Sequence, residues 1–154
     1  MLIGSYRHQV DAKGRVAVPS SLRKDLPLGS VIAKGMEGRL VIRPPEEWEK
    51  VAGHFELRSD TTKAERDFMR RLYASAREVE LDAQGRLLLD ADHRRWAAIT
   101  DRAVFVGLGN CVEVVGEEIW DGEEAGFDQA AYTALGDSVS VRAGNPPAGS
   151  PSPA

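Results

Sequence analysis

The amino-acid sequence predicts an α+β fold, mainly β, made of two copies of one unit with a helix between the copies. The first observation is a repeated motif, because residues 11–15 read Asp-Ala-Lys-Gly-Arg and residues 82–86 read Asp-Ala-Gln-Gly-Arg. The second is that short aliphatic runs flank each motif, as they do when a turn joins two β-strands. The third is one strong helical pattern, at residues 61–76, that separates the two copies.

Two hairpins are expected in each copy. An alternating run leads into the repeated motif and an aliphatic run leaves it, which predicts the first hairpin. Further along, two apolar runs flank a glycine-containing interruption and predict the second. The expected strand pairs are 5–10 with 15–18, 31–34 with 40–42, 77–82 with 86–89, and 103–106 with 112–115.

Helices are expected between and after these hairpins. The strongest, at 61–76, begins with Thr62 and Glu65 at the spacing of a capping box, and its apolar residues recur every three or four positions. Shorter helices are predicted at 19–24, from 44 to 48 onward, at 90–96 and at 125–135.

The chain is therefore expected to divide into four parts. Residues 5–47 form the first repeat, 48–75 a connecting helical segment, and 76–119 the second repeat. Residues 120–154 form an extension that is first acidic and then rich in Pro, Gly and Ser. Its last part, 143–154, contains four prolines and too few apolar side chains for a core, so we expect it to be disordered.

The repeated motif predicts a rigid turn that presents an arginine. Glycine in the motif suits a backbone with positive φ, and aspartate at the loop entry can accept a hydrogen bond from the N–H group two residues on. We interpret these four residues as structural turn residues: Asp11, Gly14, Asp82 and Gly85. Arg15 and Arg86 then lie on stiff strand ends, as two guanidinium groups that can read an anion. Alternatively, each arginine only pairs with its own aspartate, but such an exposed pair contributes about 0–1 kcal/mol.

Charge is distributed unevenly along the chain. The whole chain carries −4, residues 113–154 alone carry −7, and residues 1–112 therefore carry +3. A basic part followed by an acidic tail indicates a nucleic-acid-binding face. The candidate DNA contacts are Arg15, Arg86, Lys13 and Arg7, and Arg23 is left outside this set.

Other classes of protein are excluded by composition and spacing. No apolar run is long enough to cross a membrane, and the first residues lack the apolar segment of a signal peptide, so we expect a cytoplasmic protein. The lone Cys111 cannot form an intrachain disulfide. His8, His54 and His93 have no metal-ligand spacing with one another or with Cys111, and no nucleophile–base set appears. We expect no cofactor, no metal, no small-molecule substrate and no enzymatic activity.

The chain resembles the MraZ family of bacterial transcriptional regulators. The resemblance rests on the first eight residues, the paired Asp-x-x-Gly-Arg motifs, Pro19 and Trp120, and it covers roughly residues 1–122. It implies two tandem SpoVT/AbrB-like modules, which interleave as swapped-hairpin half-barrels of one pseudo-dimeric barrel. It also implies a ring-shaped homo-oligomer at the nucleoid that binds repeated short boxes of double-stranded DNA upstream of the division and cell-wall gene cluster. By this likeness, Arg15 and Arg86 lie on DNA-facing loops, the first loop especially.

The second copy departs from the family pattern at two positions. Asp90 stands where the family tends to have proline, and His93 where an aliphatic residue is expected. We expect Asp90 to lower the positive potential near Arg86, so that the second copy serves packing more than DNA contact. One alternative remains open, an oligomeric protein-interaction module whose acidic residues 122–154 compete with DNA or recruit a partner.

Overall fold

The computed structural model describes residues 1–142 and divides the chain into two units, Met1–Trp120 and the residues from Asp121 onward. The predicted disorder of residues 143–154 lies outside the described residues. Among the helices that the structure describes, none has the length and apolar character needed to span a membrane.

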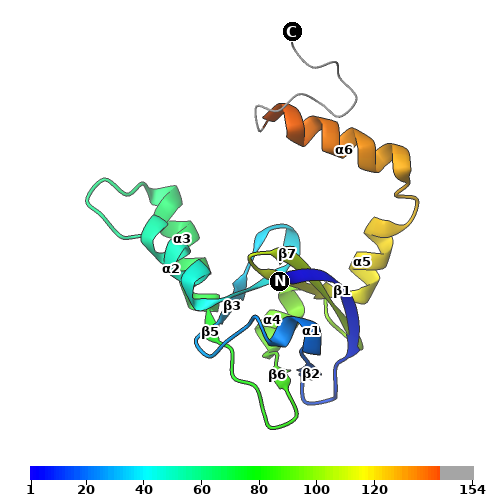
Figure 1. Cartoon of the computed structure of the whole chain (residues 1–154). Helices are drawn as coiled ribbons and strands as arrows, with labels where there is room; N and C mark the ends of the chain where they lie inside the picture. Colours follow the sequence, from blue (N-terminus) through cyan, green and yellow to red (C-terminus); the bar gives the residue numbers. More distant parts are fainter. Residues whose placement is uncertain (143–154) are drawn as a thin grey trace. The chain divides into compact units, whose positions relative to one another are not determined.

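The first unit is built on an antiparallel sheet of six strands in the order β1-β7-β8-β4-β3-β5. Figure 1 labels β1, β7, β3 and β5 of this sheet. The strands of this sheet are β1 (Leu2–Gln9), β3 (Val31–Lys34), β4 (Leu40–Arg43), β5 (Arg77–Glu78), β7 (Arg102–Gly109) and β8 (Val112–Gly116). The other two strands, β2 (Arg15–Ala17) and β6 (Arg86–Leu88), form a separate two-stranded ribbon.

Strands of the two repeats are exchanged at both ends of the sheet. Strand β1 of the first repeat pairs with β7 of the second repeat along its whole length. Its counterpart β5, at the start of the second repeat, pairs with β3 of the first. The ribbon is also shared, because β2 comes from the first repeat and β6 from the second. Neither repeat therefore completes its own sheet.

The turns of the repeated motif are present, but the prediction that the strands flanking each turn pair with each other as a hairpin is wrong. Only the isolated bridges Val10↔Val16 and Leu81↔Leu87 join the incoming and outgoing chains. The strands on either side diverge because the other repeat supplies their hydrogen-bond partners. The sheet also keeps two free edges, β1 and β5, so the closed swapped-hairpin barrel is not confirmed. The structure has mixed α/β architecture with a mainly antiparallel sheet.

The two later hairpins are confirmed, as β3–β4 and β7–β8. The second differs in one respect, since β7 continues to Gly109 and thus takes in residues 107–109, which we expected to be a turn. These residues pair with the first residues of β1, through Leu2↔Gly109 and Gly4↔Gly107. The long β1 strand explains the extension, because it offers backbone partners that no local pattern reveals.

The predicted helices are present, with one further helix at Glu117–Glu124 that we did not predict. They are α1 (Ser20–Arg23), α2 (Pro45–His54), α3 (Lys63–Ser75), α4 (Ala91–Trp96), α5 (Glu117–Glu124) and α6 (Gln129–Arg142), with a 3₁₀ turn η1 (Met36–Gly38). The capping box of α3 is present, since Thr62 Oγ1 accepts from the Glu65 N–H at 3.1 Å and Glu65 Oε2 accepts from the Thr62 N–H at 3.3 Å. Helix α6 begins later and ends later than the predicted 125–135.

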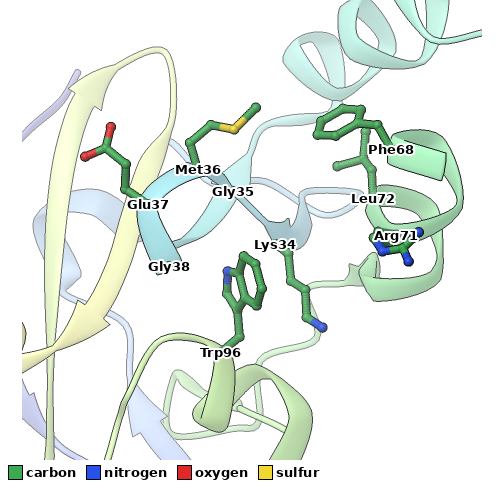
Figure 2. A pocket seen from close by; sticks show the side chains of 9 residues that line it. All are labelled: Lys34, Gly35, Met36, Glu37, Gly38, Phe68, Arg71, Leu72 and Trp96. Atoms are coloured by element: carbon green, nitrogen blue, oxygen red, sulfur yellow. The ribbon is translucent and has the colours of Figure 1, made fainter. Parts of the chain in front are cut away.

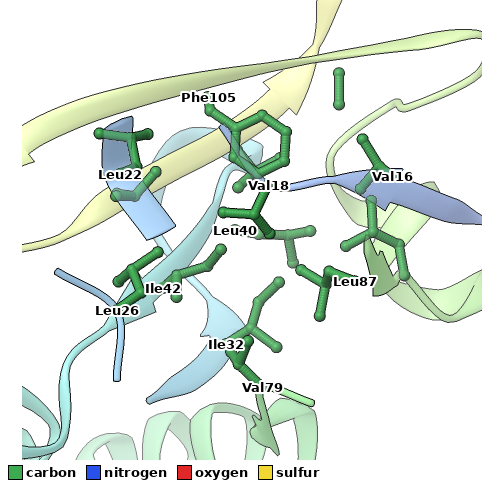
Figure 3. Close-up of a cluster of buried hydrophobic side chains, with 14 of the residues drawn as sticks. Val16, Val18, Leu22, Leu26, Ile32, Leu40, Ile42, Val79, Leu87 and Phe105 are labelled. Carbon is green, nitrogen blue, oxygen red and sulfur yellow. The ribbon is translucent and has the colours of Figure 1, made fainter. Parts of the chain in front are cut away.

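One hydrophobic core joins the two repeats (Figure 3). It takes Val16, Leu22 and Ile42 from the first repeat and Leu87 and Phe105 from the second, and all are buried. Because aliphatic burial is the main favourable term in folding, the repeats stabilise one another rather than folding as separate halves.

This shared core predicts a large difference between two substitutions on β7. Phe105 is fully buried, so Phe105→Ala is expected to lower the free energy of unfolding by about 3–5 kcal/mol. Leu108, on the same strand, is 51% exposed, and Leu108→Ala should change it by only about 0.5 kcal/mol. Urea denaturation of both variants measures the difference. Equal losses would contradict the assignment of Phe105 to the core.

Candidate nucleic-acid interface

Each copy of the motif folds into the same turn. The N–H group of the motif glycine donates to the carbonyl of the motif aspartate, at 2.9 Å in both loops. Gly14 has φ of +85° and Gly85 has φ of +75°, a backbone region that side chains with a Cβ rarely adopt. The predicted turn, and the need for glycine in it, are therefore present in both repeats.

The aspartates hold these turns from within. Asp11 Oδ1 accepts from the backbone N–H groups of Lys13 and Arg15, each at 2.9 Å. Asp82 Oδ1 accepts from the equivalent N–H groups of its own loop, at 2.9 and 3.0 Å. These hydrogen bonds lower the pKa of Asp11 from 3.8 to about 2, and the bond from the Arg15 backbone N–H is the largest cause. The equivalent bonds lower the pKa of Asp82.

The motif arginines bind back to their aspartates. Arg15 Nε donates to Asp11 Oδ2 at 2.7 Å, and Arg86 Nε donates to Asp82 Oδ2 at 2.8 Å. Arg86 Nη1 also lies 3.9 Å from Asp11 Oδ2, which brings the two loops together. The pairing that we considered as an alternative is thus present. It leaves the Arg15 and Arg86 side chains 35% and 30% exposed, so it orients the guanidinium groups without burying them.

The two loops project from the same side of the first unit, next to the β2–β6 ribbon (Figure 1). Each loop is fastened to the other repeat by its glycine carbonyl. Gly14 O accepts from the Leu89 N–H at 2.9 Å, and Gly85 O accepts from the Val18 N–H at 3.1 Å. The loops are therefore parts of one rigid surface rather than two independent tips.

Two further arginines lie against these loops, and neither was among the predicted contacts. A Cβ atom placed on Gly85 would clash with Nη1 of Arg23, and one on Gly14 would lie 3.1 Å from Cζ of Arg94. Arg23 belongs to α1 and Arg94 to α4, so each arginine covers the loop of the other repeat. The signal that could have revealed them was in the sequence, because Arg94 occupies in the second repeat the place of Arg23 in the first.

The remaining predicted contacts are placed differently. Lys13 is exposed at the tip of the first loop. Arg7 lies on β1, where its guanidinium forms an ion pair with Glu117 at 3.1 Å rather than joining the loops. The loop cluster therefore consists of five cations, Lys13, Arg15, Arg23, Arg86 and Arg94, with the two carboxylates Asp11 and Asp82.

Asp90 makes its contacts with groups other than Arg86, and the expected effect on the positive potential near Arg86 stays a prediction. The Asp90 side chain accepts from the His93 N–H at 2.8 Å, at the start of α4, and its second oxygen lies 3.6 Å from Arg77 Nε. The carboxylate partners of Arg86 are instead Asp82 and Asp11. The aspartate at position 90 is explained by helix capping, which favours this residue type.

His93 and Cys111 contribute to packing. His93 is buried, with Nε2 2.7 Å from the Ser75 carbonyl, a satisfied core histidine. Cys111 is half-buried, and burial raises the pKa of its thiol. Within residues 1–142, no group of three or more His, Cys, Asp or Glu side chains could hold a metal ion.

Comparison with known proteins agrees with the duplicated motif. The family model described as "MraZ protein, putative antitoxin-like" matches residues 1–71 and again 72–135. The second match runs past residue 122, where we expected the resemblance to end.

Several relatives carry the name transcriptional regulator MraZ. That of Thermoanaerobacter sp. (strain X514) is 37% identical over 121 residues, which cover 79% of this chain and 85% of that protein. That of Carboxydothermus hydrogenoformans is 34% identical over 139 residues, or 90% and 96% of the two chains. That of Mycoplasmoides gallisepticum is 33% identical over 135 residues, or 84% and 92%.

The loop geometry predicts an unusually acidic Asp11. Because its pKa in the folded state lies below the ordinary value of 3.8, the contribution of its carboxylate to stability is present above that value and is lost as the pH falls through about 2. NMR titration of the side-chain carboxyl should give a midpoint near 2. Asp11→Asn should remove the corresponding pH dependence of unfolding. A midpoint at the ordinary value would mean that the turn is not closed by this side chain.

Proposed function

The chain belongs to the MraZ family, and from this membership we propose that it is a sequence-specific DNA-binding transcriptional regulator. The observation that carries the proposal is the loop cluster, where five cations and two carboxylates share one rigid surface. The relatives are named as regulators rather than as enzymes, in agreement with the prediction of no catalytic activity.

The orientation of Arg15 and Arg86 supports DNA contact. A guanidinium held through Nε still presents its terminal nitrogens, and this fork can bind phosphate oxygens or a guanine edge bidentately. Preorganisation lowers the entropy lost on binding, because the side chain is already held in one orientation. Lys13 at the loop tip adds a cation suited to a phosphate. Arg7 is proposed as a peripheral contact, and its guanidinium, which pairs with Glu117, would then also have to contact a DNA phosphate.

We further propose that the targets are repeated short boxes upstream of the division and cell-wall gene cluster, bound by a ring of subunits in the cytoplasm, at the nucleoid. One loop cluster is small, so a single subunit should bind weakly. Assembly makes further contacts intramolecular and raises affinity through avidity. Boxes spaced by about one helical turn, roughly 10 bp, present successive sites on one face of the duplex.

An apolar groove supports the proposed self-assembly. It has a volume of about 370 Å³ and is lined by Met36 of η1, Phe68 and Leu72 of α3, and Trp96 of α4 (Figure 2). Met36 is 65% and Trp96 41% exposed in the single chain. A ring needs two different surfaces that meet head to tail, and this groove is proposed as one of them. The alternative function, an interaction module without sequence-specific DNA binding, would use the same groove.

Substitution of Arg15 separates these two functions. Arg15→Ala is expected to weaken binding to the fragment upstream of the chain's own gene by about 1–3 kcal/mol, the usual contribution of a specific arginine contact. The matched control is Arg70→Ala, which removes an arginine paired with Asp67 on α3. Gel shifts with both variants, at one salt concentration, give the comparison. Equal retention by wild type and Arg15→Ala would favour the interaction module.

Substitution of Met36 tests the groove. Met36→Glu places a charge on a surface that a neighbour would cover, so it should dissociate the assembly while the subunit stays folded. Leu28→Glu is the control, because Leu28 is 93% exposed and lies in the loop before β3 rather than in the groove. Sedimentation measures the mass, and circular dichroism checks the fold. An unchanged mass for Met36→Glu would remove the groove from the interface.

A further inference from the structure

We propose that each motif loop forms a composite anion site with an arginine of the opposite repeat, Arg94 with the first loop and Arg23 with the second. The ligand is a phosphate of the DNA backbone, so this inference rests on the proposed function and adds to it the groups that supply the charge.

The contact between arginine and loop is close and occurs in both repeats. A Cβ on Gly85 would clash with Nη1 of Arg23 and would lie 2.7 Å from its Cζ and 3.2 Å from its Nε. A Cβ on Gly14 would lie 3.1 Å from both Cζ and Nε of Arg94. Both glycines are needed for their positive φ. A Cβ on Gly85 would meet the Arg23 guanidinium first, whereas one on Gly14 would meet the Leu89 carbonyl oxygen first, at 2.6 Å, and then Arg94.

The charges of these two arginines are not neutralised. Within residues 1–142, neither Arg23 nor Arg94 takes part in an ion pair, and the Nε atom of each is buried without a hydrogen-bond partner. A buried polar group without a partner is unfavourable, and a charged one more so. Both side chains are only half-buried, so an external anion would meet their terminal nitrogens rather than Nε, and this arrangement occurs at the same place in both repeats.

The motif arginines cannot supply this charge alone. Arg15 is compensated by Asp11 and Arg86 by Asp82, at 2.7 and 2.8 Å. The excess positive charge of the loop cluster therefore resides on Arg23, Arg94 and Lys13. We assign orientation to the compensated pair in each loop, and attraction of the phosphate to the arginine contributed by the other repeat.

The two composite sites differ at one position. The first loop has Lys13 at its tip, and the second has Gln84 in the equivalent place. Arg23 is thus the sole uncompensated cation that we place at the second loop, within the described part of the chain. This site gives the second repeat a direct role in DNA binding, beyond the packing role that we expected from its sequence.

The test is the salt dependence of DNA binding by the full chain. Each phosphate contact contributes about 0.9 to the slope of log K against log salt. Arg23→Gln and Arg94→Gln should each lower this slope by about 0.9 for every subunit on the duplex. The reduction should be equal for the upstream fragment and a scrambled duplex, because a phosphate carries no sequence. Arg23→Lys and Arg94→Lys keep the charge and should restore most of the slope.

The controls are neighbouring cations on the same helices or at their ends. Lys24 and Arg95 are exposed, and Lys24→Gln and Arg95→Gln should leave the slope unchanged. Thermal melting shows whether each variant is folded. Where a glutamine variant is misfolded, the salt slope of the corresponding lysine variant is measured in its place. A slope that stays at the wild-type value in folded Arg23→Gln and Arg94→Gln overturns the inference. If the wild type binds the upstream fragment and the scrambled duplex equally well, the proposed function is overturned. The salt slopes measured on scrambled DNA still test the composite sites separately.

Discussion

The first unit depends on one constraint, that the backbone hydrogen bonds of each repeat are completed by the other. The clearest instance is the pair of bonds from Leu89 N–H to Gly14 O and from Val18 N–H to Gly85 O. Both lie at the point where a motif loop meets the ribbon, and the same exchange recurs in β1–β7 and β5–β3. Because an unpaired buried backbone group is costly, these bonds fix the loops relative to the sheet as firmly as they fix the strands.

This constraint gives the loops their stiffness, and the aspartates give them their shape. Asp11 uses one oxygen for two backbone N–H groups and the other for Arg15 Nε. One ionised side chain thus sets the turn and the arginine together, and its strongly lowered pKa reflects that double use. A loop arranged in this way needs little reorganisation to meet a polyanion, which is how rigid surfaces gain affinity from few contacts.

Local features of the fold and site could be predicted from the sequence, whereas long-range pairing could not. The turn at Gly14, the capping box at Thr62 and the β3–β4 hairpin depend on neighbouring residues, whose types reveal the required backbone. The exchange of β1 and β5 depends on partners far along the chain, and an alternating pattern says only that a strand is half-buried. The repeat identifies Arg94 as the equivalent of Arg23, but the position of Arg94 over the Gly14 loop exists only after the two repeats have interleaved.

The covalent linkage of the two loops has a consequence for the symmetry of recognition. A homodimer of single repeats would present two identical loops and would be restricted to palindromic targets. Here the loops belong to one polypeptide and already differ, since Lys13 faces solvent in one and Gln84 in the other. The two ends of this surface are therefore chemically different, and under the proposed function it would distinguish the two directions along a DNA strand.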